Sequence, residues 1–457
     1  MTAGLALDLG SDISSSVRSR LERHRGACAP LVEGTVVSVV GLTVEVAGVG
    51  AAVGELLALQ TPHGPREAEV VAAESGVLRC MPLAGTAGLV VGARARATGQ
   101  VATVPVGWSL LGRVLDADGT PLDDGPPLHG APRAPLDGAA PHPLRRRRVA
   151  APMPLGVRVI DAFTTIGLGQ RIGVFAGSGV GKSSLLSMIT RGSRAQATVL
   201  ALVGERGREV REFIEDDLGP EGLARSVVVV ATSDATPLMR LRAAFTATRI
   251  AESLADDGAD VLLLLDSLTR VAMAQREVGL SAGEPPATRG YPPSTFALLP
   301  RLLERAGPRE RGSITGVYTV LVEGDDHNEP IADAARAILD GHIVLDRRIA
   351  TAGRFPSVDV LESVSRVAAR VTTPEQRSAV TVLRRLLAAH RDVKDLIEVG
   401  AYVPGSNPDV DAALRLMPRL DAVCRQPIAE IAPYEETWNH ILEIAREARA
   451  GGAGGVT

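Results

Sequence analysis

One glycine-rich stretch of the chain holds residue types suited to binding phosphate. It begins with the apolar strand pattern of residues 172–176, continues through a turn containing Gly177, Gly179 and Gly181, and enters a helical pattern at Lys182. Glycines let the backbone turn tightly with its N–H groups facing inward, and a helix N-terminus adds partial positive charge. The stretch therefore predicts a phosphate-binding loop rather than a plain glycine turn before an ordinary helix.

The residues that open the helix give this loop its chemistry. In a P-loop the lysine reaches the β- and γ-phosphates and the next hydroxyl holds Mg²⁺, so we assign these roles to Lys182 and Ser183. Ala176 stands where the pattern G-x-x-x-x-G-K-[ST] begins with glycine. Lys182 and Lys394 are the only lysines among 49 basic residues, so a compact ammonium is kept here despite the bias toward arginine. We expect the nucleotide contacts to come from Gly177, Ser178, Gly179, Val180, Gly181, Lys182, Ser183 and Ser184.

Two acidic residues follow predicted strands on the carboxyl side. Glu205 comes just after residues 198–203, and Asp266 comes directly after residues 261–265. In a parallel sheet these strand ends meet at the edge where ligands bind, so both carboxylates should face the phosphate-binding loop. Asp266 is then expected to hold Mg²⁺ through its water, and Glu205 to orient or polarise the attacking water of a phosphoryl transfer. For Glu205 alone, a surface acid that caps a helix is the alternative.

Strand and helix patterns alternate after Gly156. Apolar runs at residues 172–176, 198–203, 227–231 and 261–265 have the length and composition of strands buried on both faces. Helical patterns separate these runs, which indicates right-handed crossovers and a parallel sheet. The fold class predicted for this part of the chain is α/β.

Residues 31–104 have a different texture, with short β-rich runs broken by glycine. Such spacing is typical of a small antiparallel barrel. Barrels that bind single-stranded nucleic acid stack bases on aromatic side chains in a basic groove, but residues 31–100 contain no Phe, Tyr, Trp or Lys. We therefore predict a packing or assembly role and no nucleic-acid partner.

Two further segments flank the α/β pattern. Residues 121–150 contain seven prolines and the arginine run 145–148, which predicts an extended connector whose arginines face solvent rather than an acidic surface. The tail from Pro374 is helical, and one of its helices begins near Pro408 and should bend or end at Pro418.

The totals limit the possible classes of protein. At 457 residues the chain is long enough for two or three domains, and a net charge of −4 gives no electrostatic indication of nucleic acid or an acidic membrane. Three widely spaced cysteines form no metal or disulfide pattern, which fits a reducing cytoplasm. The longest purely aliphatic runs have five residues, too few to span a membrane.

Longer motifs occur along the chain: TIGLGQR (165–171), AGSGVGKS (176–183), GERGREVREF (204–213), MAQREVG (273–279), AGEPPATRGYPPS (282–294), VEGDDHNEPIAD (322–333), GHIVLD (341–346) and SVSRV (363–367). Together they resemble one protein family, the ATPase of the flagellar protein export apparatus, over about residues 32–425. That enzyme is similar to the injectisome type III secretion ATPases and, more distantly, to the catalytic subunits of rotary ATP synthases. The resemblance implies a RecA-like P-loop NTPase core with a parallel sheet, an N-terminal small β-barrel and a C-terminal helical domain.

The resemblance also assigns residues and divides the chain. Arg366 resembles an arginine finger donated to a neighbouring subunit's ATP, where a guanidinium would offset charge on the transferring phosphate; a structural salt bridge is the alternative. Phe355 resembles the aromatic that packs on adenine, with an ordinary core residue as the alternative. Residues 284–294 resemble a pore-facing loop near a central stalk, and Arg206 and Arg270 resemble accessory or switch residues. The implied domains are a partner-binding segment (1–30), a β-barrel (31–104), an ATPase domain (105–373, with 121–150 as connector) and a helical domain (374–457).

The implied function is hydrolysis of ATP with Mg²⁺ by a homo-hexameric ring that energises export of flagellar proteins. The implied location is the cytoplasm, with peripheral association at the inner membrane. The implied partners are a stator-like regulator on the N-terminal segment, a central stalk protein, export-gate components and cargo–chaperone complexes. An injectisome ATPase is the closest alternative.

Three further alternatives each meet a contrary feature of the sequence. A rotary synthase subunit would carry an acidic lever segment, which the turn at residues 400–407 lacks. A Rho-like nucleic-acid translocase would need the aromatic residues that the barrel lacks. A non-catalytic ring subunit would not need the water-orienting acid Glu205.

Overall fold

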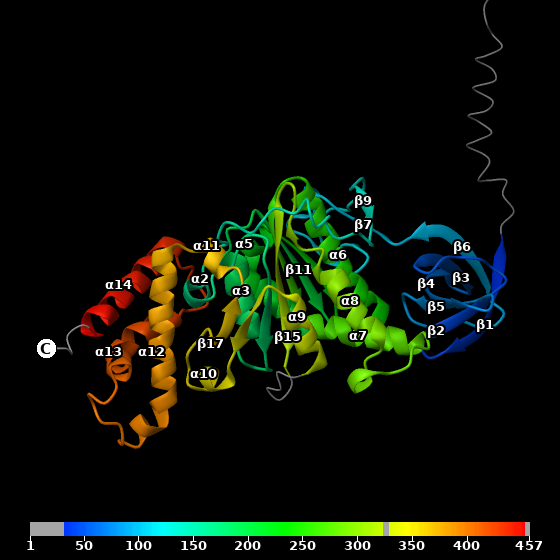
Figure 1. The fold of residues 1–457 in the computed structure, drawn as a ribbon. Coiled ribbons are helices and arrows are strands. Elements are labelled where there is room, and N and C mark those ends of the chain that lie inside the picture. The colour runs from blue at the N-terminus through cyan, green and yellow to red at the C-terminus, as the bar shows by residue number, and fades with distance from the viewer. Residues whose placement is uncertain (1–31, 323–328, 453–457) are drawn as a thin grey trace, which may run out of the picture. The chain divides into compact units, whose positions relative to one another are not determined.

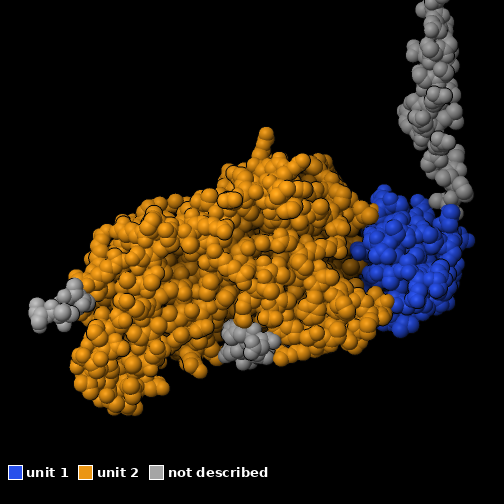
Figure 2. Space-filling view, viewed as in Figure 1, with its two compact units in different colours: residues 1–100 blue, residues 101–457 orange. Residues whose placement is uncertain are grey.

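The computed structural model describes residues 32–322 and 329–452. The chain forms two compact units, residues 1–100 and residues 101–457, which Figure 2 shows in different colours. The predicted partner-binding segment at residues 1–30 lies outside the described residues.

The first unit is a closed six-stranded barrel, as the sequence predicted. Neighbouring strands are antiparallel, in the order β1-β2-β5-β4-β3-β6. Val44 and Val46 of β2 and Leu57 and Leu59 of β3 are fully buried, because alternate side chains of a strand point to one face and fill the interior. The strands are β1 (Glu33–Val40), β2 (Thr43–Ala47), β3 (Glu55–Thr61), β4 (Gly64–Glu74), β5 (Val77–Pro82) and β6 (Arg94–Val101).

The second unit is built on a nine-stranded sheet with the order β17-β16-β10-β15-β13-β11-β12-β8, with β14 paired to β15 (Figure 1). Strands β16 to β8 run parallel, which confirms the predicted parallel sheet, whereas β17 and β14 are antiparallel. The strands are β8 (Val114–Asp116), β10 (Arg171–Ala176), β11 (Ala197–Val203), β12 (Ser226–Ala231), β13 (Asp260–Asp266), β14 (Gly307–Pro308), β15 (Ser313–Leu321), β16 (Gly341–Leu345) and β17 (Val358–Ser365).

Helices cover the sheet and extend beyond its β17 end. Helix α6 packs on β11, β12 and β13, while α2, α3 and the helices α12 to α14 share one hydrophobic cluster with the other face (Figure 1). The described helices are α2 (Arg158–Phe163), α3 (Lys182–Gly192), α4 (Gly207–Glu212), α5 (Gly219–Ala224), α6 (Pro237–Asp256), α7 (Leu268–Ser281), α8 (Pro293–Leu303), α9 (Pro330–Ile338), α10 (Arg347–Thr351), α11 (Ala368–Val371), α12 (Pro374–Glu398), α13 (Pro408–Cys424) and α14 (Tyr434–Gly452), with the 3₁₀ turns η1 (Trp108–Leu110) and η3 (Thr288–Gly290). In the part of the chain that the structure describes, no helix combines the length and apolar character needed to cross a membrane.

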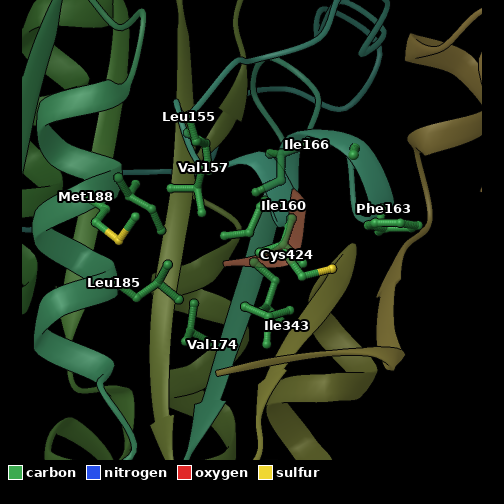
Figure 3. Close-up of a cluster of buried hydrophobic side chains, with 14 of the residues drawn as sticks. Leu155, Val157, Ile160, Phe163, Ile166, Val174, Leu185, Met188, Ile343 and Cys424 are labelled. Carbon is green, nitrogen blue, oxygen red and sulfur yellow. The ribbon is translucent and has the colours of Figure 1, made fainter. Parts of the chain in front are cut away.

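The C-terminal helices are fastened to the sheet by apolar packing. Leu383 and Leu386 of α12 are buried in the cluster that also contains Ile160 and Ile343, and Figure 3 shows Cys424 at the end of α13 among them. The buried side of α12 therefore faces this core. Helix α13 does not end at Pro418 as one reading of the sequence allowed.

The helix pattern around residues 210–218 is less regular than expected. Helix α4 is followed by a π-helical turn, η2 (Phe213–Leu218), and then by α5. Val210, Phe213 and Leu218 are all buried, so the segment keeps one buried face although it is not one continuous α-helix.

Arg145, Arg147 and Arg148 are exposed, in agreement with the predicted solvent-facing run, whereas Arg146 is partly buried. The Arg146 guanidinium donates to the carbonyls of Glu304 and Ala306 (2.9 Å to Ala306), and Arg147 donates to those of Arg309 and Gly312 (3.0 and 2.7 Å). Glu304 and Ala306 come just after α8, where carbonyls lack helical partners and attract cations. The connector is thus held on the second unit, and its strand β9 (Arg133–Pro135) pairs with β7 (Thr103–Pro105).

Candidate active site

The predicted phosphate-binding loop joins β10 to α3. Gly179 and Gly181 have φ angles of 74° and 93°, the left-handed region that favours glycine. Gly181 is the residue before the first helical residue, Lys182, so the free N–H groups of the first turn of α3 point out of the loop. Gly177 and Val180 are buried, whereas Ser178, Gly179 and Ser183 are exposed. The loop therefore presents backbone donors and a hydroxyl to an incoming anion.

The structure brings three predicted residues together at the carboxyl edge of the sheet. The Lys182 Nζ atom lies 2.6 Å from Asp266 Oδ1 and 3.2 Å from Glu205 Oε1. All three side chains are mostly buried, with exposed fractions of 14%, 7% and 18%. They converge because β10, β11 and β13 are parallel and each residue follows or ends its strand at the same edge.

Thr319 is also part of this group, although no pattern in the sequence marked it. Its hydroxyl donates to Asp266 Oδ1 over 2.6 Å and is fully buried in β15, the strand beside β13. A threonine within an apolar strand looks like any β-branched core residue, so only the pairing of β13 with β15 reveals the contact.

Burial and charge act in opposite directions on these groups. Burial lowers the pKa of Lys182, but the charges of Asp266 and Glu205 and their hydrogen bonds outweigh it, and the net pKa is raised. For Glu205, burial raises the pKa and the charge of Asp266 raises it further, while Lys182 and Arg270 lower it, so the net pKa is raised. Lys182 therefore stays protonated, and Glu205 binds a proton more readily than an ordinary glutamate does.

Next to these charges lies a pocket of about 130 Å³. Its lining includes Ser183, Glu205 and Asp266, so one hydroxyl and two carboxylates open into one space. Hard oxygen ligands of this kind suit Mg²⁺, which uses one or two protein ligands together with substrate phosphates and water. Within residues 32–322 and 329–452, no group of three or more His, Cys, Asp or Glu side chains could hold a metal ion. The residues present fit a Mg²⁺ that arrives with a nucleotide better than a dedicated metal centre.

Phe355 lies beside the phosphate-binding loop rather than in the core. Its ring atoms are 3.4 and 3.5 Å from the place that a Cβ atom on Gly181 would occupy, and 42% of the residue is exposed. Two residues further on, the Ser357 hydroxyl donates to the Val180 carbonyl over 2.6 Å. An exposed ring held next to the loop can offer its face to a planar base.

Arg366 is not part of this group. It follows β17, and Ser365 pairs with Gly341 at the start of β16, whereas the phosphate-binding loop follows the opposite end of β10. Gly341 to Leu345 alone spans about 13 Å at the usual strand rise. Arg366 is exposed, and its guanidinium donates to the Arg336 carbonyl over 3.1 Å. Within the described residues, Arg366 makes no ion pair with an acidic side chain, which disfavours the salt-bridge alternative.

The accessory arginines have different surroundings. Arg270 packs its aliphatic part against Gly204, next to Glu205. Arg206 is largely exposed and pairs with Glu209 over 3.2 Å. In the segment 284–294, Arg276 from α7 lies over the ring of Tyr291, 5.4 Å from its centroid.

Comparison with known proteins agrees with this geometry. Three family models match the chain: the ATP synthase alpha/beta family β-barrel domain (residues 36–99), the nucleotide-binding domain of the same family (156–365) and the T3SS EscN ATPase C-terminal domain (372–443). The flagellum-specific ATP synthase of Bacillus subtilis is 50% identical over 407 residues, 88% of this chain and 93% of the relative. The chain belongs to this family of export ATPases.

Further relatives come from both branches of the family. The type 3 secretion system ATPase of Xanthomonas euvesicatoria is 47% identical over 91% of this chain and 94% of its own. The structure of assembled EscN from the type III secretion system of enteropathogenic E. coli has a TM-score of 0.86 and 42% identity, covering 90% of this chain and all of that one. EscN in complex with its central stalk EscO has a TM-score of 0.84. These matches confirm the predicted fold class and make the chain a nucleotide-binding ATP hydrolase.

Proposed function

We propose that this ATPase hydrolyses Mg²⁺–ATP at the interfaces of a homo-hexameric ring and thereby energises export of flagellar proteins. The observation that carries the proposal is the pairing of Lys182 with Glu205 and Asp266 beside the phosphate-binding loop, while Arg366 lies at the other edge of the sheet. A site that binds the phosphates but lacks its own arginine is completed by a second copy of the chain.

In this proposal each residue of the chain has one task. The loop and Lys182 bind the phosphates, Ser183 and Asp266 hold Mg²⁺, and Glu205 orients the attacking water. Arg366 of the next copy offsets charge on the transferring phosphate. When bound, Mg²⁺ would neutralise phosphate charge, which matters here because one ammonium faces two carboxylates.

The same proposal covers how the adenine base is bound and which partners the chain contacts. Phe355 packs on adenine, supported by its exposed ring beside Gly181. A central stalk protein passes through the ring, supported by the likeness to EscN in complex with its central stalk EscO. The further partners that we propose for the chain are a stator-like regulator, the export gate, cargo–chaperone complexes and the inner face of the membrane.

An injectisome role is the second candidate. It is favoured by the match of residues 372–443 to the T3SS EscN ATPase C-terminal domain and by the similarity to EscN. The flagellar role is preferred because the flagellum-specific ATP synthase of Bacillus subtilis reaches 50% identity, above the 47% of the type 3 secretion system ATPase of Xanthomonas euvesicatoria. Deleting the gene and scoring flagellar assembly separates the two, since an injectisome ATPase would leave the flagella intact.

Mixing two inactive variants tests the shared site. Glu205→Gln removes the water-orienting group of one side, and Arg366→Ala removes the charge from the other. If neighbouring copies build one site, a mixture of the two variants regains ATPase activity, because some interfaces then hold Glu205 and Arg366 together. Activity is measured as phosphate release at a protein concentration that supports assembly.

A second mixture acts as the control. Glu205→Gln mixed with Lys182→Ala should stay inactive, because both changes damage the same half of the site. If the Glu205→Gln and Arg366→Ala mixture stays equally inactive although it assembles, the interface proposal is wrong.

A further inference from the structure

Gln426 is a buried polar residue whose role the site described above does not explain. It is only 3% exposed and lies just after α13, in the α13–α14 connection (residues 425–433). Its side-chain amide donates to the carbonyls of Gly156 and Glu430, both over 2.8 Å, and its Oε1 accepts the Arg158 backbone N–H over 2.9 Å. A buried amide with three such bonds fixes its backbone firmly.

The backbone of Gln426 contacts the segment that carries Phe355. Its N–H donates to the Phe355 carbonyl over 2.9 Å. Neighbouring contacts reinforce this bond, because Arg425 donates to the Gly353 carbonyl over 3.2 Å and Arg354 pairs with Asp421 over 3.4 Å. Residues 353–355 are therefore tied to the end of α13 and to the connection after it.

A second anchor holds the same segment from the phosphate side. The Ser357 hydroxyl bonds the Val180 carbonyl of the phosphate-binding loop over 2.6 Å. The segment that carries Phe355 is thus held at Ser357 by the phosphate-binding loop and at the Phe355 carbonyl by the C-terminal helical region. Phe355 as a whole is 42% exposed, so these backbone anchors, rather than close packing, determine where it stands.

The α13–α14 connection is itself held on the ATPase core. Arg158 donates to the carbonyls of Val423 and Arg425 (3.3 and 2.7 Å) and pairs with Glu430. The Ala432 N–H donates to the Gly156 carbonyl over 3.0 Å. Movement of the C-terminal helices that shifted this connection would therefore reach Phe355 through Gln426.

We propose that Gln426 is a positioning residue for Phe355, so that the α13–α14 connection sets the affinity of the site for the base of the nucleotide. The inference rests on the proposed packing of Phe355 on adenine. It separates two parts of nucleotide binding: the phosphates are bound by the loop and Lys182, and the base by a ring that the C-terminal region holds in place.

The test compares ATP with tripolyphosphate, which has the phosphates but lacks the base and its ribose. The affinities of the full-length chain for Mg²⁺–ATP and for Mg²⁺–tripolyphosphate are measured by titration calorimetry. Phe355→Ala should weaken ATP binding about 5- to 150-fold, the usual range for losing an aromatic–base stack. Gln426→Leu should weaken ATP binding by part of that factor, about 3-fold or more. Neither variant should change tripolyphosphate binding.

A matched control and a double variant sharpen the result. Gln376→Leu makes the same chemical change at the start of α12, where Gln376 accepts the Thr373 N–H, and should leave both affinities unchanged. The variant Phe355→Ala with Gln426→Leu should bind ATP no more weakly than Phe355→Ala alone. If Gln426→Leu fails to fold, Gln426→Asn keeps the amide but shortens its reach and takes its place.

The outcomes distinguish the two proposals. If Phe355→Ala leaves ATP binding unchanged, the adenine role of Phe355 is lost and the inference with it. If Phe355→Ala weakens ATP binding but Gln426→Leu does not, only the inference is overturned. It is also overturned if Gln426→Leu weakens ATP and tripolyphosphate equally, or if the two changes multiply in the double variant.

Discussion

The two edges of the central sheet carry opposite kinds of functional residue. At the carboxyl edge, Lys182, Glu205 and Asp266 are mostly buried and bonded to one another. At the amino edge, Arg366 is exposed and donates to a backbone carbonyl. The first group can bind a ligand within one chain, whereas Arg366 is remote from that group. Under the proposed function the two edges are two halves of one site, which neighbouring copies of the chain bring together.

The backbone around Arg366 is nevertheless well fixed. The Arg366 N–H donates to the Asp340 carbonyl over 2.9 Å, and the buried Gln170 amide donates to the same carbonyl and to the Ser365 hydroxyl. Asp340 in turn pairs with Arg171 over 3.1 Å. An exposed side chain on a rigid base suits a residue that must reach a neighbour in one geometry.

Removal of Arg366 should have the largest effect on ATP hydrolysis. We expect Arg366→Ala to lower kcat for ATP hydrolysis about 10³- to 10⁵-fold, the range for loss of an arginine that stabilises phosphoryl transfer. The Mg²⁺–ATP affinity of the unassembled chain should not change, because Arg366 is remote from the phosphate-binding loop. Phosphate release and titration calorimetry measure the two quantities.

Arg370→Ala is the control for that change, since Arg370 is also an exposed arginine of the amino edge. It should keep nearly full activity. If Arg366→Ala weakened the binding of ATP to the unassembled chain, the two edges would not be independent.

Two threonines of β15 test whether Mg²⁺ dependence belongs to the carboxyl edge alone. Thr319→Val removes the bond to Asp266, and we expect the Mg²⁺ concentration for half-maximal activity to rise about 10- to 100-fold, as for other residues that orient a metal ligand. Thr315→Val removes the 2.8 Å bond from the Gly169 N–H at the amino edge. It should lower the free energy of unfolding by about 1–3 kcal/mol without changing the Mg²⁺ dependence. Equal Mg²⁺ dependence in both variants would contradict the role of Asp266.

The smallest expected effect concerns pH at the carboxyl edge. Because the pKa of Glu205 is raised and its ionised form is needed, kcat/KM of the wild-type chain should fall on acidification at a pH above the ordinary glutamate pKa of 4.5. Arg270 lowers the Glu205 pKa, so Arg270→Met should raise it and move the acidic limb to higher pH. Arg276→Met, in the same helix, should leave the limb where it is. A shift toward lower pH in Arg270→Met would refute the assigned role of Glu205.

Local motifs were enough to predict the carboxyl edge. The lysine of the loop directly follows its glycines, and Glu205 and Asp266 directly follow apolar runs, so the strand ends could be placed without knowing the strand order. The resemblance to export ATPases supplied Arg366 and Phe355, which no local pattern marks.

Other parts of the molecule depended on contacts between distant segments. Thr319 meets Asp266 across 53 positions, Ser357 meets Val180 across 177, and Gln426 meets Arg158 across 268. The contacts of the arginine run were missed for the same reason, because Arg146 donates to the Ala306 carbonyl across 160 positions and Arg147 to the Gly312 carbonyl across 165. Helix α13 continues past Pro418 because the tertiary packing of the buried Leu416 and Leu420 compensates the hydrogen bond that proline removes.

The sequence by itself determined that a strand, a glycine-rich turn and a helix would form a phosphate-binding loop, and that two acids would end nearby strands. These features depend on backbone angles and on side-chain periodicity, which neighbouring residues control. The tertiary structure decided that Arg366 would stand apart from that loop and that Gln426 would lie beside Phe355. Both depend on the order and direction of elements in space, which are set by burial of the whole core rather than by any short stretch of residues.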